Sequence, residues 1–241
     1  MAINKESNGY TIGFAIVLVV VVGTILAAVS MGLKPIQQKN AAKKKRMDIL
    51  GAIKIESTRQ NVDDVFKKHI VDGYIIDAKG KKIEGKTLED AEKLDIQKQF
   101  RNSGISPEDR QYPLFIAEKE GQKLFIIPMV GKGLWGPIWG YVAVKENMVD
   151  IQAAKFDHKT ETPGLGAEIK VYKSFQKQFE DNKKISDDNG EFVKITVTKG
   201  SGASGNPHAV DGITGGTITS KGVEEMMERT LKVYVSHFHA K

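Results

Sequence analysis

The feature that most constrains this chain is an uncharged apolar run near its start. Residues 11–31 contain no Asp, Glu, Lys or Arg and consist mainly of Val, Ile, Leu and Ala. As a helix, this run extends about 30 Å, which matches the hydrocarbon core of a bilayer. The run therefore predicts one transmembrane helix at 11–31, within an N-terminal segment of residues 1–33.

A cleaved signal peptide is the competing interpretation of this segment. Lys5 precedes the run, and Ala28-Val29-Ser30 resembles a small-residue cleavage site. However, the run exceeds the about 7–15 apolar residues of a signal peptide, which favours an uncleaved anchor in the lipid bilayer. No acidic residue lies in the run, so no ion site is expected within the helix.

Positive charge is concentrated directly after the apolar run. The formal net charge is +6, and six basic residues between Lys34 and Arg46 account for it, since Lys5 and Glu6 cancel. We interpret residues 34–60 as a basic stalk and linker helix that contacts lipid headgroups. The remainder is neutral, so no nucleic-acid partner is predicted. By the positive-inside rule, this stalk would place the soluble domain in the cytoplasm.

Residues 61–241 have the pattern of a soluble α+β domain, an antiparallel sheet flanked by helices, with its core at about 112–241. The chain has no cysteine, which excludes disulfides and thiolate chemistry. The patterns predict a helix starting near Asn61, strands at 73–77, 114–117, 123–128, 138–144, 149–156 and 193–197, a short helix at 171–179, and a long C-terminal helix capped by Thr219 or Ser220.

The stretch from Asp211 to Thr217 reads Asp-Gly-Ile-Thr-Gly-Gly-Thr and lies just before that last helix. Helix starts offer unpaired N–H groups and a partial positive charge, which favour a phosphate. Gly215 and Gly216 leave the Thr217 hydroxyl open to modification. A plain strand–loop–helix turn has the same composition, so these residues alone assign no cofactor.

Two further glycine-rich stretches contain residues suited to an aromatic ligand. In Glu161-Thr162-Pro163-Gly164-Leu165-Gly166, a leucine protrudes between two glycines; residues 131–140 hold Trp135 and Trp139. Either tryptophan suits stacking on a ligand or closing one end of a core. The Gly-x-Gly-x-x-Gly at 131–136 is interrupted by Trp135 and lacks a following helix, so a dinucleotide fold is not indicated.

Metal binding is not predicted, and neither is catalysis by this chain's own side chains. His237 and His239 form a His-x-His pair, but no other ligands lie near them in the sequence. We expect them to belong to a frayed C-terminal tail.

Taken together, these motifs resemble the C subunit of the sodium-translocating NADH:quinone oxidoreductase, a family of membrane proteins with an FMN-binding domain. The resemblance covers nearly the whole chain and rests on Gly-Lys-Gly-Leu-Trp-Gly at 131–136, the 161–166 loop and the C-terminal motif. The family pattern is Asp-x-x-Ser/Thr-Gly-Ala-Thr. The one departure is Gly216, where alanine is usual.

The resemblance implies FMN bound through a phosphoester to Thr217. The implied cofactor-binding residues are Thr217, Thr214, Gly215, Gly216, Ile213, Trp135, Glu161, Thr162, Leu165 and Gly166. It also implies a flavin transferase that uses FAD and Mg²⁺ and recognises Asp211, Thr214 and Thr217. The bound cofactor would carry out the redox chemistry while the protein attaches and positions it.

The implied function is that of an electron-transfer subunit in a multi-subunit, sodium-transporting NADH:quinone reductase of the inner membrane, which has no activity alone. Its partners would be the other subunits. The family places the soluble domain on the periplasmic side, against the charge count. Two alternatives remain: the G subunit of the related ferredoxin:NAD oxidoreductase complex, and a non-catalytic membrane-anchored binding domain without flavin.

Overall fold

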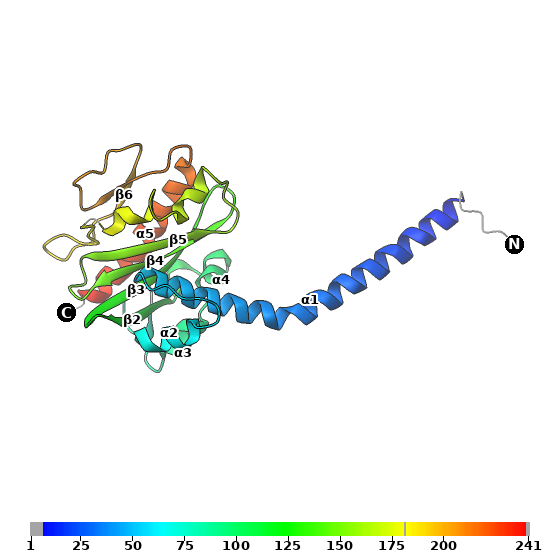
Figure 1. Ribbon diagram of the computed structural model, residues 1–241, viewed down its shortest axis with the longest axis horizontal. Helices are drawn as coiled ribbons and strands as arrows, with labels where there is room; N and C mark the ends of the chain where they lie inside the picture. The colour runs from blue at the N-terminus through cyan, green and yellow to red at the C-terminus, as the bar shows by residue number, and fades with distance from the viewer. Residues whose placement is uncertain (1–6, 181, 240–241) are drawn as a thin grey trace. The chain divides into compact units, whose positions relative to one another are not determined.

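The chain folds into two compact units. The structure, a computed structural model, describes residues 7–180 and 182–239. Its units are Met1–Lys45 and Arg46–Lys241. Most of helix α1 (Asn8–Ala52) lies in the first unit, and residues 46–52 of the same helix belong to the second (Figure 1).

The first unit is the apolar part of α1. This helix is long and apolar enough to cross a membrane, and none of the side chains in its apolar window is buried. Thr24, inside the run, donates its hydroxyl to the carbonyl of Val20 at 2.7 Å. A hydroxyl satisfied within its own helix is compatible with a hydrocarbon environment. The helix therefore has the properties expected of the predicted anchor at 11–31.

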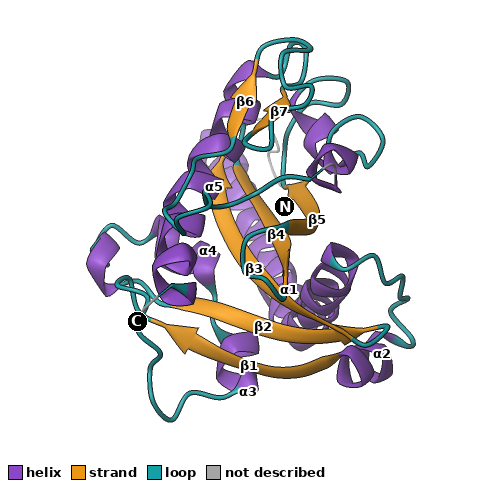
Figure 2. Ribbon diagram, turned by 90° about the vertical axis from the view of Figure 1, so that its left-hand side faces the viewer, coloured by secondary structure: helices purple, strands orange, loops and turns teal. Residues whose placement is uncertain are grey.

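The second unit is built on a five-stranded antiparallel sheet in which neighbours in sequence are neighbours in space (Figure 2). This arrangement confirms the α+β prediction. The strands are β1 (Ile70–Ile76), β2 (Tyr112–Lys119), β3 (Gln122–Lys132), β4 (Pro137–Lys145) and β5 (Ile151–His158). Helix α2 (Val62–His69) precedes β1 and follows Asn61, as predicted. Three short elements lie between β1 and β2: α3 (Leu88–Lys93), α4 (Ile96–Arg101) and η1 (Pro107–Asp109).

Both faces of the sheet are buried. Along β3, Phe125 and Ile127 point into one hydrophobic cluster, whereas Leu124 and Ile126 point into the other. One cluster is completed by α5 (Thr217–Phe238), and the other by α2 and by residues 49–53. Burial on both faces explains why the strands read as nearly continuous apolar runs rather than alternating ones.

The β2–β3 hairpin forms where the sequence predicts it. Lys119 pairs with Gln122 across a two-residue turn. The turn residues Glu120 and Gly121 both have positive φ, at 52° and 76°. Two consecutive left-handed residues match the twist of antiparallel strands, which is why a glycine occupies the second position.

Helix α5 has the predicted apolar stripe but begins earlier than predicted. Its first residue is Thr217 and its N-cap is Gly216, so neither Thr219 nor Ser220 is the cap. Both hydroxyls have other partners: that of Ser220 accepts from the Ile213 N–H at 3.0 Å, and that of Thr219 donates to Glu161. Because these contacts come from distant or looped segments, local capping rules do not detect them.

Two other predictions were wrong in detail. Residues 171–179 were expected to form a helix, but they form irregular turns that lead into the 3₁₀ turn η3 (Gln176–Glu180); another 3₁₀ turn, η2 (Gly166–Lys170), precedes them. The buried Gln176 side chain donates to the carbonyls of Phe156 and Ile169, which holds this segment against β5. The strand expected at 193–197 is only β6 (Thr196–Thr198), paired in parallel with β7 (Ala209–Asp211).

The end of α5 is anchored rather than frayed, so the expected loose tail was wrong for His237. One ring nitrogen of His237 lies 2.9 Å from the Tyr74 hydroxyl, and the other lies 2.7 Å from the Gly80 carbonyl. Gly80 has a φ of 82°, and a Cβ there would lie 2.9 Å from the backbone nitrogen of His237. The turn after β1 therefore needs glycine in order to pack against α5.

A buried carboxylate fastens β6 to α5. Glu224 accepts from the Val197 N–H at 2.6 Å and pairs with the ammonium groups of Lys194 and Lys221 at 2.9 Å each. Burial alone would raise the pKa of this carboxyl. The hydrogen bonds from Lys194, Val197 and Lys221 outweigh burial, so the pKa lies below its ordinary value of 4.5.

Replacing Glu224→Gln should lower the free energy of unfolding at pH 7 by about 1–3 kcal/mol, because Lys221 and the Val197 N–H lose their charged acceptor and Lys194 keeps only Glu228. The folded-state pKa is depressed, so this contribution is complete above about pH 4.5 and is lost as the pH falls through the folded pKa. Urea unfolding at pH 7 and near pH 3.5 measures the difference. Glu225→Gln, on the exposed side of α5, is the control. If Glu224→Gln lowered the free energy of unfolding equally at both pH values, the stabilising role given to the ionised Glu224 would be contradicted.

Candidate functional site

The start of α5 presents the Thr217 hydroxyl at the surface. After β7 the chain turns through Gly215, with a φ of 74°, and the Gly216 N–H donates to the Ile213 carbonyl at 3.0 Å. Thr217 is exposed and is the first helical residue. Among the described residues no side chain caps α5, so its first N–H groups remain open to a ligand.

Thr217 borders a cavity of about 200 Å³. Three segments that are distant in sequence form the wall: the loop after β3, the loop after β5 and the start of α5. The lining residues are Leu134, Trp135, Glu161, Thr162, Leu165, Gly166, Gly215, Gly216, Thr217, Ile218 and Thr219. Pockets that enclose a drug-sized ligand measure about 300–1,000 Å³, so a larger ligand here would stay partly exposed.

The buried carboxylate of Glu161 holds these three segments together. One oxygen accepts from the Trp135 N–H at 2.8 Å, and the other accepts from the Thr219 hydroxyl at 2.5 Å. The neighbouring Thr160 hydroxyl donates to the Trp135 carbonyl at 2.9 Å. Hydrogen bonds to a buried carboxylate are strong and costly to break, so the loop after β3 is fixed against α5.

Glycines are required where the three segments meet. A Cβ at Gly133 would lie 2.5 Å from a Glu161 oxygen, and one at Gly166 would lie 2.5 Å from both Glu161 and Thr219. Side chains at Gly133 and Gly166 would push the loops apart, so these glycines are needed for close approach. Gly215 is constrained differently: its φ of 74° favours glycine, whereas the side chain that a Cβ would meet is the exposed end of Leu165.

Gly216, the departure from the family pattern, is also closely packed. A Cβ there would lie 2.9 Å from Cγ2 of Ile213 and 3.3 Å from the Gly166 nitrogen. Ile213 packs against the hydrophobic core, so its side chain has little room to move away. In this chain the glycine at 216 fits the bulky residue at 213.

Apolar side chains surround the Thr217 hydroxyl and face solvent. Leu134, Trp135, Leu165 and Ile218 are between 43% and 65% exposed. Trp139 differs, because it packs against the core cluster on the α2 side of the sheet. The sequence allowed each tryptophan either to stack on a ligand or to close one end of a core. The exposure of Trp135 matches the first interpretation, and the packing of Trp139 matches the second.

The structure brings most of the predicted site residues together. Trp135, Glu161, Thr162, Leu165, Gly166, Gly215, Gly216 and Thr217 all line the cavity. Ile213 and Thr214 do not line it: Ile213 packs inward against the core, and Thr214 is exposed outside the wall.

Three lining residues were missed from the sequence: Leu134, Ile218 and Thr219. Thr219 lies four residues before Val223, on the buried stripe of α5, so helical spacing places its hydroxyl inward. Ile218 is an apolar residue outside that stripe, which is a signal for an exposed apolar contact.

Asp211 does not line the cavity. Its carboxylate accepts from the Ala203 N–H at 2.9 Å and from the Thr198 hydroxyl at 3.3 Å. The Gln178 side chain accepts from its N–H at 2.6 Å. These contacts give Asp211 a direct role in holding the 198–203 turn beside β7. Recognition by a transferase stays a prediction.

Metal binding has no support in the described part of the chain. Among residues 7–180 and 182–239, no group of three or more His, Asp or Glu side chains is placed to hold a metal ion. His237 belongs to the contact with the turn at Gly80, and His239 lies beside Gly190.

Comparison with known proteins assigns this architecture to a family. The model of the FMN-binding domain matches residues 133–232, a range that contains every residue lining the cavity. The chain is 31% identical to the C subunit of the Na⁺-translocating NADH-quinone reductase of Haemophilus ducreyi over 232 residues, covering 92% of this chain and 88% of the relative. It is 28% identical to the same protein of Vibrio alginolyticus over 238 residues, covering 95% and 92%.

Solved structures show the same fold. The crystal structure of the corresponding protein from Parabacteroides distasonis superposes with a TM-score of 0.75 at 36% identity, covering 87% of this chain and 98% of that one. NqrC from Shewanella oneidensis has a TM-score of 0.68 at 22% identity, covering 83% and 98%, and supports the fold alone. On these grounds, the chain belongs to the family of the C subunit of the Na⁺-translocating NADH-quinone reductase, a multi-subunit oxidoreductase.

Proposed function

We propose that this chain is a membrane-anchored electron-transfer subunit that carries FMN on Thr217 through a phosphoester bond. The observation that carries the proposal is the position of Thr217. It is exposed, it begins α5, and it borders a glycine-walled cavity within the residues that match the FMN-binding domain. Bound FMN would supply the one-electron redox chemistry, and α1 would hold the chain in the bilayer.

The residues around Thr217 fit a flavin phosphate. The uncapped N–H groups of the first turn of α5 and the partial positive charge of the helix start suit a phosphate attached to its first residue. Gly215 and Gly216 leave no side chain between that phosphate and the backbone. The same part of the chain therefore attaches the phosphate and neutralises part of its charge.

The rest of the cavity fits a planar aromatic ring. Leu165 and Trp135 offer exposed apolar surfaces beside Thr217, and Glu161 fixes the loops that carry them. Burial of apolar ring surface against these side chains, rather than hydrogen bonding, would orient the ring. The small cavity leaves part of the ring outside, where a neighbouring protein of the reductase can approach it.

Attachment would be carried out by a flavin transferase. The Thr217 hydroxyl oxygen forms a bond to the phosphorus of the FMN half of FAD, the bond from that phosphorus to AMP breaks, and the hydroxyl proton is released. Mg²⁺ would be bound by the transferase together with FAD. Exposure of Thr217 leaves its hydroxyl accessible to such an enzyme.

Thr217→Ala should abolish flavin attachment, because it removes the only hydroxyl of that residue. The chain is co-expressed with an active flavin transferase and FMN fluorescence is measured in a denaturing gel, with intact mass as the second readout. Thr217→Ser keeps a hydroxyl and should retain fluorescence, and Thr58→Ala, remote from the cavity, is the control. Fluorescence in Thr217→Ala, or none in wild type, would refute attachment at this residue.

Glu161→Ala should loosen the cavity without removing the attachment residue. The Trp135 N–H and the Thr219 hydroxyl lose their buried acceptor, so the free energy of unfolding should fall by about 2–4 kcal/mol. Fluorescence of the attached flavin should also become more accessible to a soluble quencher. Glu168→Ala is the matched control, since that carboxylate accepts one 3.2 Å bond from the exposed Gly164. If Glu161→Ala and Glu168→Ala changed the free energy of unfolding and the quenching equally, Glu161 would have no special role in holding the cavity together.

We also propose that the soluble unit faces the outer side of the membrane. The basic residues from Lys34 to Arg46 favour the opposite orientation under the positive-inside rule. The resemblance to the family supports the outer side, because flavin attachment must occur where the transferase is. Assembly with other subunits would then override the local charge.

Trypsin added to intact spheroplasts should therefore release the soluble unit, since the lysines at 34–45 before it are cleavage sites. An immunoblot of the soluble unit measures the loss, and a cytoplasmic marker must stay intact in the same sample. Survival of the full chain in intact spheroplasts, with digestion only after lysis, would place the domain inside.

A further inference from the structure

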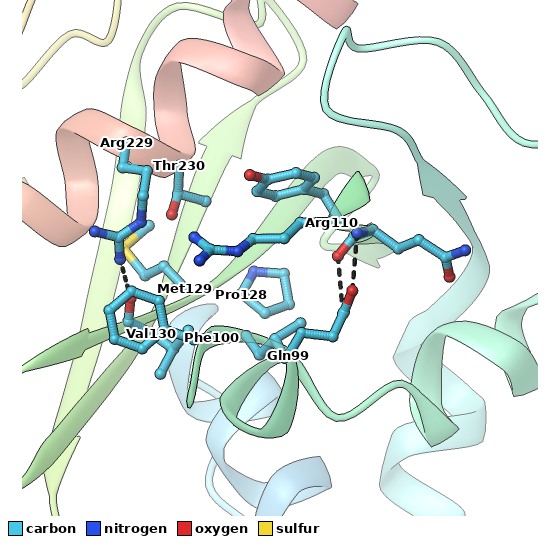
Figure 3. A pocket seen from close by; sticks show the side chains of 11 residues that line it. Gln99, Phe100, Arg110, Pro128, Met129, Val130, Arg229 and Thr230 are labelled. Atoms are coloured by element: carbon cyan, nitrogen blue, oxygen red, sulfur yellow. Dashed lines mark hydrogen bonds between the residues drawn. The ribbon is translucent and has the colours of Figure 1, made fainter. Parts of the chain in front are cut away.

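We propose that a second pocket, between α4, the start of β2 and α5, binds a carboxylate anion. Two arginines, Arg110 and Arg229, line it together with the apolar side chains of Ile96, Phe100, Pro128, Met129 and Val130 (Figure 3). It shares no lining residue with the cavity at Thr217. The proposal is therefore independent of flavin attachment.

The two guanidinium groups meet at one aromatic ring. The guanidinium carbon (Cζ) of Arg229 lies 4.5 Å from the centroid of the Phe100 ring, and that of Arg110 lies 5.4 Å from the same centroid. Figure 3 shows the two side chains entering the pocket from opposite sides. A guanidinium over a ring face is attracted to it, but its N–H groups stay free to bind an anion in their own plane.

Donor groups in this pocket remain available. Arg229 uses one nitrogen to donate to the Val130 carbonyl at 2.5 Å, which fixes its orientation. Nε of Arg110 is buried and has no hydrogen-bond partner among the described residues. A buried donor without an acceptor is costly, so a ligand that accepts from it would be stabilising.

Positive charge in the pocket is not balanced locally. In the described part of the chain, no carboxylate lies within ion-pair distance of Arg110 or Arg229, and Glu225 acts on Arg229 only at longer range. Burial lowers the pKa of Arg229, and the charge of Arg110 lowers it further. An anion between the two groups would relieve this repulsion.

The pocket favours a carboxylate over a bulkier anion. Its cavity volume is about 30 Å³, much smaller than that of the cavity at Thr217, and most of its wall is apolar. The planar guanidinium fork matches a carboxylate, and Pro128, Met129 and Ile96 suit a short alkyl arm. Such a ligand comes either from a free short-chain carboxylic acid or from an Asp or Glu side chain of a neighbouring polypeptide.

The test measures the reactivity of Arg110 toward phenylglyoxal in the full chain in detergent, by peptide mass mapping. Sodium propionate should protect Arg110 saturably relative to sodium chloride at equal ionic strength, and neutral propionamide should not. Arg229→Gln should weaken propionate binding about tenfold or more, because a charge-assisted hydrogen bond is lost. Arg229→Lys keeps the charge without the fork and should also weaken binding.

The matched control is Arg101→Gln, which removes an exposed arginine at the end of α4 and should leave protection unchanged. The reciprocal variant, Arg110→Gln, is measured through protection of Arg229. Circular dichroism and thermal unfolding show that each variant folds. Equal protection by propionamide, or an unchanged propionate dissociation constant in Arg229→Gln, would overturn the proposal.

The same labelling in the purified reductase, with all its subunits present, separates the two sources. Protection of Arg110 without added propionate, removed by Arg229→Gln, would identify a carboxylate of a neighbouring polypeptide. Protection that requires propionate would identify a free acid. Arg110 that reacts equally with and without propionate, in both the isolated chain and the assembled reductase, would overturn carboxylate binding altogether.

Discussion

One buried carboxylate determines how the candidate site is assembled. Glu161 accepts from the Trp135 backbone and from the Thr219 side chain, and so joins the loop after β3 to the first turn of α5. Thr217 lies two residues before Thr219, so its position follows from that of the bonded turn. Because a buried charge must keep its donors, the segments cannot separate without a large cost. The glycines at 133 and 166 allow the close approach that this bonding requires.

Much of the fold could be predicted from the sequence because its main elements follow local rules. The hairpin at Glu120-Gly121 and the stripe of α5 are set by turn geometry and periodicity. The start of α5, the 3₁₀ turns at 166–180 and the short β6 were not predictable in this way. They depend on side chains bonded across the fold, such as Gln176 to β5, and no window of sequence contains both partners.

The site was predictable chiefly through resemblance rather than physics. A glycine-rich turn before a helix is common, and only the combination of three motifs distinguished it. Thr214 and Ile213 were included because they lie within the motif. Thr214, however, is exposed and outside the cavity wall, and Ile213 packs on the core. Thr219 was overlooked because its partner, Glu161, is distant in sequence. Asp211 shows that a motif residue can hold its own loop together.

The small volume of the cavity at Thr217 bears on how a redox group could be retained there. A shallow pocket gives weak affinity, and a freely diffusing ring would leave it often. The proposed covalent tether would keep the ring at a local concentration in the millimolar range and prevent its loss to the medium. In a chain built this way, the surrounding side chains have no need to provide retention. Evolution can instead adjust them for the potential of the carrier and for the speed at which the next carrier reaches its exposed edge.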